Sequence, residues 1–271
     1  MADQPYVELN DGRSMPQFGL GVWRTPAQDA AQVVATALDA GYLAVDTAAI
    51  YGNEEGVGDA IAGRNVFLTT KLWNADQGYD SALRAFDTSC RKLRRDAVEL
   101  YLIHWASPAR GKYVESWKAL TRLKEEGRAL SIGVSNFAEI HLKEIIDATG
   151  LTPAVNQIEL HPDFQQRKMR RIDDGLKIKT QSWSPLGQAK ALDNNELKRI
   201  AEKHGKSPAQ VAIRWHLDSG LIVIHKSVHP ERIRQNIDVF DFKLDAEDME
   251  AVAKLDHEGG RIGGDPMTAN Y

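Results

Sequence analysis

The 271 residues are 42% hydrophobic and 27% charged, the composition of a globular protein with enough apolar mass for a sizeable core. A formal net charge of −4 without any block of Lys or Arg excludes the broad positive field that nucleic-acid binding needs. Cys90 is the single cysteine, and no apolar run approaches bilayer length, so we expect no disulfide, no metal site, no membrane partner and a monomer in the cytoplasm.

The chain opens with a short hairpin, because Asn10-Asp11-Gly12 is a turn signal near the start of the chain. Strand-like and helix-period segments then alternate up to residue 240. Strand character is found in eight segments, 18–22, 42–46, 65–71, 98–104, 130–135, 154–160, 177–183 and 221–226. Helical periodicity covers 27–40, 80–93, 113–126, 137–149 and 208–219. The last helix has Ser207 as its N-cap and Pro208 at its first position.

This alternation predicts an α/β fold in which parallel strands are joined by right-handed crossovers. Eight such units can close on themselves, so we expect a (β/α)8 TIM barrel. We expect one domain over 1–271, because no linker or composition break divides the chain; a doubly wound open sheet is the structural alternative. Two further helical stretches, 195–204 and 245–255, are extra to the eight units and are expected outside the barrel or across one end.

Reactive residues collect at the carboxyl ends of the predicted strands, the side of a parallel barrel where active sites form. Asp46, Lys71 and His104 end the second, third and fourth strands. Tyr51 follows in the loop after Asp46. Each alone has an ordinary explanation, since polar side chains at strand ends are mostly solvated or packed at the rim. Together the four residues favour one reaction.

Reduction of a carbonyl group needs hydride at carbon and a proton at the developing alkoxide oxygen. Tyr51 is the candidate acid, and the ammonium group of Lys71 is expected to lower its pKa. Asp46 would hold that ammonium in an ion pair, and His104 would donate a second hydrogen bond that orients the carbonyl. These roles predict a carbonyl reductase.

Longer segments resemble the aldo-keto reductases, namely DTAAIYGNE, TTKLW, LYLIHW, IGVSNF, AVNQIELHP, SWSPLG and KSV. The resemblance covers essentially the whole chain. The chain is similar in particular to the bacterial 2,5-diketo-D-gluconate reductases. It implies a (β/α)8 barrel, NADPH as hydride donor and a catalytic tetrad that falls on Asp46, Tyr51, Lys71 and His104. It also implies small aldehydes and ketones as substrates, including 2,5-diketo-D-gluconate (reduced to 2-keto-L-gulonate), methylglyoxal and β-keto esters.

Contacts to the nicotinamide end of the cofactor follow from the same resemblance. Ser135, Asn136 and Gln157 would hold the carboxamide, and Trp183 would lie against the nicotinamide ring. The segment after Trp183 would complete this part of the site with Ser184, Pro185, Leu186 and Gly187. Taken alone, Trp183 would be barrel core, because tryptophan commonly packs on an apolar side.

Contacts to the adenosine end would come from the segment after the eighth strand. Lys226, Ser227 and Arg232 resemble the residues that hold the 2′-phosphate, which favours NADPH over NADH, although NADH stays possible. The same segment would add contacts from Val228, Gln235 and Asn236. Taken alone, Lys226 and Arg232 would be ordinary surface cations.

Aromatic residues near the strand ends predict the substrate pocket. Trp23, Trp73 and Trp105 would form an aromatic mouth, with Ile50 and His104 also at the substrate. The segment GGRIGGDPMTANY is too rich in glycine for a helix, and in the family the corresponding tail folds over the pocket. We therefore expect a C-terminal loop over the active site.

Several residues depart from the family pattern: Leu43 replaces the usual Arg after Gly-Tyr, and three further departures follow. His225 stands where the family usually has Pro, and Ala106 replaces a Pro often found after His-Trp, so both positions lose a backbone restraint. Gln235 stands where a Glu commonly helps to hold the adenine. None of these residues belongs to the tetrad, so they bear on cofactor affinity and loop geometry.

Other reaction classes fit less well. Segment 19–24 (GLGVWR) lacks the third glycine of a Rossmann fingerprint, and 133–137 (GVSNF) lacks the last glycine of a nucleophile elbow. No histidine spacing matches a zinc site. A Schiff-base aldolase acting through Lys71 stays open, as does a nicotinamide-binding regulatory subunit with a redox-sensing role. Borohydride trapping would identify the aldolase, and only a reductase would turn over carbonyls with NADPH.

Overall fold

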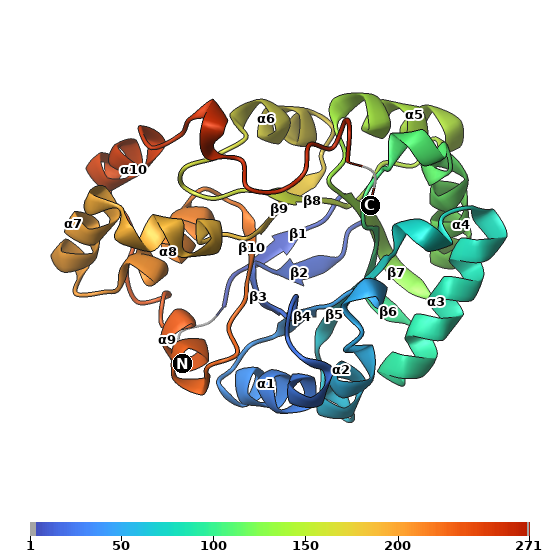
Figure 1. The fold of residues 1–271 in the computed structure, drawn as a ribbon, viewed down its shortest axis with the longest axis horizontal. Coiled ribbons are helices and arrows are strands. Elements are labelled where there is room, and N and C mark those ends of the chain that lie inside the picture. Colours follow the sequence, from blue (N-terminus) through green and yellow to red (C-terminus); the bar gives the residue numbers. More distant parts are fainter. Residues whose placement is uncertain (1–3, 270) are drawn as a thin grey trace.

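The computed structural model describes residues 4–269 and 271, in which parallel strands close into a barrel ringed by helices (Figure 1). The barrel strands are β3 (Phe18–Gly21), β4 (Ala44–Asp46), β5 (Phe67–Leu72), β6 (Val98–Ile103), β7 (Ala129–Ser135), β8 (Val155–Glu159), β9 (Lys179–Trp183) and β10 (Ile222–His225). Each strand pairs with the next along the chain, and β10 closes the barrel on β3. The predicted (β/α)8 barrel is confirmed, and the alternative of an open sheet is wrong.

A two-stranded antiparallel hairpin precedes the barrel, as the turn signal predicts. Strand β1 (Tyr6–Glu8) pairs with β2 (Ser14–Pro16), and Gly12 takes the left-handed conformation between them with φ +80°. Leu9 and Met15 are buried in one cluster with Val155 and Ile222, the first residues of β8 and β10, and with Leu100 of β6. The hairpin therefore covers the amino end of the barrel and leaves the carboxyl end for a site.

Helices fill the connections between strands. They are α1 (Ala27–Asp39), α2 (Glu54–Ile61), α3 (Tyr79–Leu93), α4 (Tyr113–Glu125), α5 (Glu139–Thr149), α6 (Arg167–Gly175) and α8 (Pro208–Asp218), with the short 3-10 helix η1 (Ala49–Tyr51) after β4. The two predicted extra helices are α7 (Asn195–His204) and α10 (Ala246–Ala253), which lie together outside the ring (Figure 1). The chain after β10 forms α9 (Pro230–Asn236). Within 4–269 and 271, no helix combines the length and the apolar character needed to cross a bilayer.

Helix α3 illustrates how sequence spacing covers the barrel. Its buried side chains Ala82, Phe86, Cys90 and Leu93 recur at helical spacing on one face. The Phe86 ring lies edge-on to Tyr101 of β6, with ring centroids 4.8 Å apart. Burial raises the pKa of the Cys90 thiol to about 11, so at neutral pH this cysteine packs as an unreactive core residue.

Helix α8 begins as its sequence predicts. The Ser207 hydroxyl oxygen accepts a hydrogen bond from the Gln210 backbone N–H at 3.3 Å. The Gln210 side-chain oxygen in turn accepts from the Ser207 backbone N–H at 2.9 Å. This reciprocal capping box satisfies two backbone donors that a helix start leaves without partners, so Pro208 can occupy the first position.

A buried carboxyl group couples the stability of the barrel to pH. Asp173 of α6 is fully buried and accepts hydrogen bonds from Asn156 Nδ2 at 3.2 Å and Thr180 Oγ1 at 2.9 Å. Burial raises the pKa of Asp173 from 3.8 to about 7. The folded chain therefore keeps a proton that the unfolded chain releases. This contribution stabilises the fold at low pH and is lost as the pH rises from about 4 to about 7.

Replacement of Asp173 by Asn is expected to remove this loss. We compare the free energy of unfolding of Asp173→Asn with that of the native chain. The difference in favour of the variant should increase by on the order of 3 kcal/mol from about pH 4 to about pH 7. Urea unfolding at a series of pH values measures the difference. Asp174→Asn, which changes the exposed neighbouring carboxyl group, is the control. A difference for Asp173→Asn that does not vary with pH would contradict the assignment.

Candidate active site

Three neighbouring strands bring the predicted tetrad together at the carboxyl end of the barrel. Asp46 is the last residue of β4, Lys71 lies on β5, His104 follows β6, and Tyr51 ends η1. The pairing of β4 with β5 sets Asp46 opposite Thr69. Lys71 is two residues beyond Thr69 and so lies on the same face of its strand, which directs its side chain toward Asp46.

Lys71 and Asp46 form a buried ion pair. Lys71 Nζ donates hydrogen bonds to Asp46 Oδ1 at 2.5 Å and to the Thr47 backbone oxygen at 2.9 Å. Asp46 Oδ2 accepts a further bond from Gln157 Nε2 at 2.7 Å. Burial lowers the pKa of Lys71, against the opposing effect of Asp46. Because the side chain is fully buried, the carboxylate is what holds the ammonium in its charged form.

Tyr51 lies over this pair as a protonated phenol. Lys71 Nζ is 5.2 Å from the centroid of the Tyr51 ring, which stands edge-on to His104 with centroids 5.7 Å apart. Burial, and then the charge of Asp46, raise the pKa of Tyr51 well above 10. The predicted net lowering of the Tyr51 pKa is not found, because burial and the charge of Asp46 outweigh the effect of the Lys71 ammonium, whose hydrogen bonds go to Asp46 and Thr47.

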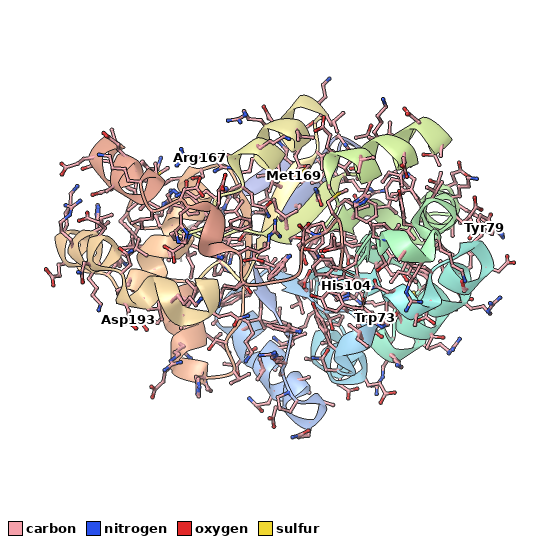
Figure 2. All side chains as sticks on the ribbon, turned by 45° about the horizontal axis from the view of Figure 1, so that its top comes forward. Trp73, Tyr79, His104, Arg167, Met169 and Asp193 are labelled. Atoms are coloured by element: carbon pink, nitrogen blue, oxygen red, sulfur yellow. The ribbon has the colours of Figure 1, made fainter. Side chains whose placement is uncertain are left out.

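His104 is a neutral imidazole. Burial, and then the nearby charge of Lys71, lower the pKa of His104 well below 6.5. Its ring lies edge-on to Trp73 with centroids 5.2 Å apart, and Figure 2 shows the two side chains next to each other. Nδ1 is buried without a hydrogen-bond partner among the described residues. A neutral imidazole has one N–H, so His104 can donate one uncharged hydrogen bond to a carbonyl oxygen.

The residues predicted to hold the nicotinamide form one hydrogen-bonded row across β7, β8 and β9. Trp183 Nε1 donates to Asn136 Oδ1 at 2.8 Å, and Asn136 Nδ2 donates to Ser135 Oγ at 3.0 Å. Ser135 Oγ donates to the Gln157 backbone oxygen at 2.8 Å. The amide oxygens of Asn136 and Gln157 are the acceptors that a carboxamide NH2 group needs, so this set of side chains fits a nicotinamide.

The segment after the nicotinamide row turns sharply. Ser184 has φ +52° and Gly187 has φ +55°, both in the left-handed region. Pro185 is buried and Leu186 half-buried between them. A Cβ at Gly187 would meet His161 Nδ1 at 3.3 Å. The predicted Ser-Pro-Leu-Gly contacts therefore lie on a tight turn directly after β9.

The residues predicted for the adenosine end gather after β10 and on α9. Lys226 and Arg232 are exposed cations, and the Ser227 side chain between them is buried. Two cations beside a hydroxyl group suit a dianionic phosphate. Gln235 is exposed, whereas Asn236 is buried and its Nδ2 donates to a histidine ring. The side chain of Asn236 therefore bonds to the protein interior, unlike the surface cations.

The predicted substrate residues lie at different depths. Trp23 and Ile50 are exposed at the rim, by 39% and 47%, while Trp73 packs on the histidine of the tetrad. Trp105 is nearly buried and lies against Tyr271 with ring centroids 5.1 Å apart. The three tryptophans therefore do not form an evenly open mouth, because one of them is covered by the C-terminal segment.

Comparison with known proteins decides the family. The model of the aldo/keto reductase family matches residues 15–257, which include the whole barrel from β3 to β10. The chain belongs to the aldo/keto reductase family. The resemblance inferred from its motifs is confirmed.

Relatives of this aldo/keto reductase match it from end to end. An aldo-keto reductase of Mycolicibacterium smegmatis is 53% identical over 98% of both chains. The methylglyoxal reductase DkgA of Yersinia pestis is 51% identical over 98% of both chains. A crystal structure of a Gox0644 mutant in complex with NADPH is 56% identical, has a TM-score of 0.98, and is aligned over 99% of this chain and 100% of that chain.

The C-terminal segment of this aldo/keto reductase, residues 257–269 and 271, crosses the carboxyl end of the barrel (Figure 1). We call this segment the tail. Glu159 of β8 holds it, since Oε1 accepts from Ile262 N–H at 2.6 Å and Oε2 accepts from Gly263 N–H at 2.8 Å. A Cβ at Gly263 would stand 2.6 Å from the Trp183 ring, so only glycine lets the tail lie this close. The predicted loop over the active site is confirmed.

Sequence reasoning assigned no role to Glu159. Its signal is that it follows Gln157 by two residues on β8, so both side chains lie on the same face of the strand. Glu159 is buried, and His161 Nε2 donates a third hydrogen bond to it at 3.2 Å. The Glu159 carboxylate thus connects the tail directly to the barrel. It accepts hydrogen bonds from two backbone amides that follow it by 103 and 104 residues in the sequence.

Replacement of Glu159 by Gln is expected to loosen the tail. Gln retains one acceptor oxygen but turns an NH2 group toward a backbone N–H, which costs about 2 kcal/mol. Hydrogen exchange of the Ile262 and Gly263 amides should therefore accelerate by at least about tenfold. Glu258→Gln, at an exposed carboxylate of the same tail, is the control. Unchanged exchange in Glu159→Gln would show that the tail is held by other contacts.

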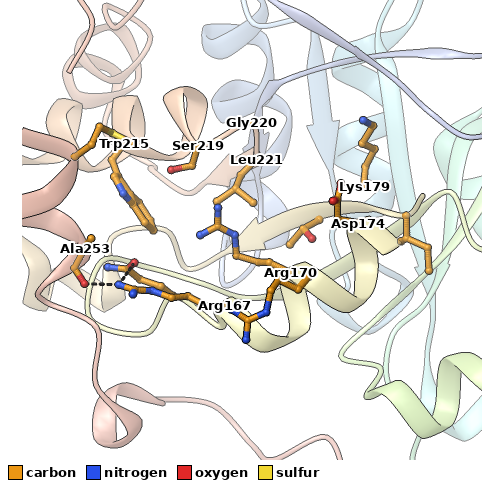
Figure 3. A pocket seen from close by; sticks show the side chains of 14 residues that line it. Arg167, Arg170, Asp174, Lys179, Trp215, Ser219, Gly220, Leu221 and Ala253 are labelled. Atoms are coloured by element: carbon orange, nitrogen blue, oxygen red, sulfur yellow. Dashed lines mark hydrogen bonds between the residues drawn. The ribbon is translucent and has the colours of Figure 1, made fainter. Parts of the chain in front are cut away.

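A separate cavity of about 530 Å³ lies outside the barrel between α6, α8 and α10 (Figure 3). Arg170, Lys179, Trp215 and Leu221 are among its lining residues. It contains none of the tetrad and none of the predicted cofactor or substrate residues. The reactive residues of this aldo/keto reductase are instead gathered beneath the tail.

Proposed function

We propose that this enzyme reduces small aldehydes and ketones to alcohols, with Tyr51 as the general acid. The enzyme is an NADP-dependent oxidoreductase, in agreement with its family, its methylglyoxal reductase relatives and the NADPH complex of a structural neighbour. The observation that carries the proposal is the buried pair of Lys71 and Asp46 beside Tyr51 and His104. This arrangement supports the proposal that the groups bind a carbonyl oxygen and protonate it.

The four side chains have different roles in the proposed reaction at the carbonyl oxygen. NADPH, when bound, supplies the hydride. Neutral His104 donates a hydrogen bond that orients the carbonyl, and Tyr51 transfers its O–H proton as negative charge develops, because an alkoxide is a stronger base than a phenolate. The ammonium of Lys71, held by Asp46, stabilises the phenolate left on Tyr51. Solvent then returns a proton to Tyr51, which restores the starting state.

We infer compact carbonyl compounds as the substrate class. The tail packs on Trp183 at Gly263, and the Tyr271 ring packs on Trp105, the residue after His104; these two contacts support a confined site. Methylglyoxal is the first candidate, because relatives from Yersinia pestis and Escherichia coli, 51% and 48% identical, are named methylglyoxal reductases. We propose 2,5-diketo-D-gluconate and β-keto esters as further candidates.

The Schiff-base aldolase alternative needs an accessible, unprotonated amine. Lys71 is fully buried, and its Nζ donates to Asp46 and Thr47. The amine therefore presents no free lone pair to a substrate, which argues against this alternative. The regulatory-subunit alternative predicts NADPH binding without turnover and is tested by the same kinetic experiment as the proposal.

A panel of carbonyl substrates, assayed in parallel with NADPH and NADH by nicotinamide absorbance, tests the proposed function. We expect turnover of methylglyoxal, with kcat/KM at least about tenfold higher for NADPH than for NADH. Tight NADPH binding without turnover of any carbonyl would favour the regulatory subunit. The cytoplasmic location and the monomeric state stay predictions.

A further inference from the structure

His225 ends β10 at the position where the family pattern has proline. The absence of a proline ring predicts a less restrained backbone at the end of β10. The His225 side chain nevertheless restrains this strand end. It is fully buried, and its ring stacks on Phe18 with centroids 5.1 Å apart and planes 24° apart. It also contacts Tyr42 and Asn236, which are 2% and 5% exposed. A buried side-chain network thus supplies the restraint that a proline ring would give.

The hydrogen bonds of this network leave one consistent arrangement of protons. The Tyr42 hydroxyl donates to the Ile233 backbone oxygen at 2.9 Å, so its oxygen accepts from His225 Nε2–H at 2.6 Å. Asn236 Nδ2 then donates to His225 Nδ1 at 3.3 Å. A proton on Nδ1 would break this bond, and burial lowers the pKa of His225 to about 3. The His225 ring is therefore uncharged near neutral pH and connects Tyr42 to Asn236 by hydrogen bonds.

This network joins three parts of the chain. Tyr42 precedes β4, His225 ends β10, and Ile233 and Asn236 lie on α9. Helix α9 has only seven residues, and Ile233 is its one buried apolar residue. A helix this short is not stable by itself, so its position depends on such tertiary contacts.

The segment that the network holds is the one predicted to bind the 2′-phosphate. The loop from 226 to 229 leaves β10 directly after His225 and carries Lys226. Helix α9 carries Arg232, which directly precedes Ile233, the residue whose backbone oxygen accepts the hydrogen bond from the Tyr42 hydroxyl. Both cations are exposed, whereas the contacts that fix their backbone are buried. The contacts of His225 and Tyr42 therefore hold the backbone that carries the two cations, although the His225 ring does not reach the surface.

We propose that His225 is a positioning residue for the adenosine end of NADPH, which holds α9 against β10 so that Lys226 and Arg232 converge on the 2′-phosphate. This inference rests on the proposed cofactor site. It assigns to a buried neutral side chain a part in the preference for NADPH over NADH. The effect should be confined to cofactor binding, because His225 touches none of the tetrad.

His225→Phe tests the inference, since it keeps an aromatic ring against Phe18 and removes both ring nitrogens. The Kd and KM for NADPH are expected to rise about tenfold, while kcat at saturating NADPH is unchanged. The Kd for NADH should change much less, because NADH has no 2′-phosphate. Tyr42→Phe, which removes one bond and leaves His225 in place, should shift NADPH binding in the same direction by a smaller factor.

Two comparisons separate the possible outcomes. Arg232→Ala should weaken NADPH binding, and if it does not, the proposed phosphate site itself is wrong. If Arg232→Ala weakens NADPH binding but His225→Phe leaves the ratio of NADPH to NADH affinity unchanged, the positioning role is overturned. A variant that is merely less stable would lose affinity for both cofactors equally and would have a lower Tm. If His225→Phe does not fold, the same ratio is measured in Tyr42→Phe, and an unchanged ratio there overturns the inference.

Discussion

Replacement of Tyr51 by Phe is expected to lower kcat for methylglyoxal reduction by ~10²–10⁴-fold, the contribution typical of a positioned general acid. Phe retains the ring that stands edge-on to His104 and over the Lys71 ammonium, so the variant removes little besides the hydroxyl proton. Burial keeps that proton on Tyr51 in the native enzyme, since the pKa of the hydroxyl lies well above 10. Steady-state kinetics at saturating NADPH measure the loss.

Cofactor binding is the internal control for Tyr51→Phe. The Kd for NADPH, measured by quenching of tryptophan fluorescence, should stay within about twofold of the native value. Tyr6→Phe, at a tyrosine that is 55% exposed in the hairpin, should change neither binding nor turnover. Reduction at a near-normal rate by Tyr51→Phe would mean that another group donates the proton.

Replacement of Asp46 by Asn is expected to cost both stability and activity. It leaves the ammonium of Lys71 fully buried without a carboxylate, and breaking a buried ion pair in this way costs about 3 kcal/mol or more. The charge that stabilises the phenolate of Tyr51 is also lost if Lys71 releases its proton. Urea unfolding at pH 7 and steady-state kinetics measure the two effects.

A second substitution separates these effects. Lys71→Met in the Asp46→Asn background removes the uncompensated cation, so the double variant should recover most of the stability but none of the activity. Asp39→Asn is the control, because Asp39 pairs with Arg64 on the surface, where an ion pair contributes about 1 kcal/mol or less. Native stability in Asp46→Asn would contradict the importance of the buried pair.

Most barrel strands could be predicted because they are short segments rich in apolar residues between turn signals. Segment 98–104, for example, corresponds to β6 (Val98–Ile103). Helix α6 (Arg167–Gly175) was not predicted, because its sequence RKMRRIDDG has only two apolar side chains and no capping side chain starts it. Helix α9 (Pro230–Asn236) was missed because seven residues are too few to display a helical period.

Asp46, Lys71 and His104 could be predicted because they lie at or next to strand ends, and Tyr51 because it lies in the loop after Asp46, so the barrel topology brings all four to one end. The pKa of Tyr51 could not be predicted from the sequence, because it depends on distances between side chains. A Lys71 ammonium directed at the hydroxyl would lower that pKa strongly, whereas burial and the charge of Asp46 outweigh an ammonium that is paired with Asp46 at 2.5 Å. The structure brings the four predicted side chains together, and the net shift of the Tyr51 pKa is upward where the sequence predicts a downward shift.

Glu159 and His225 show what local patterns leave out. The partners of Glu159 lie 103 and 104 residues away, and Tyr42 is separated from His225 by 183 residues. No periodicity or motif connects residues so far apart. A buried polar residue at a strand end is the available signal, since such a group needs a partner from elsewhere in the chain.

Transfer of deuterium from NADPH labelled at C4 of the nicotinamide tests the central claim most directly. The enzyme is incubated with the labelled cofactor and methylglyoxal, and the product is analysed by mass spectrometry and NMR. The account predicts an alcohol that carries the deuterium on its carbinol carbon in native enzyme, and almost none of this product in Tyr51→Phe. An unlabelled product, or equal labelling in Tyr51→Phe, would contradict hydride transfer with Tyr51 as the acid.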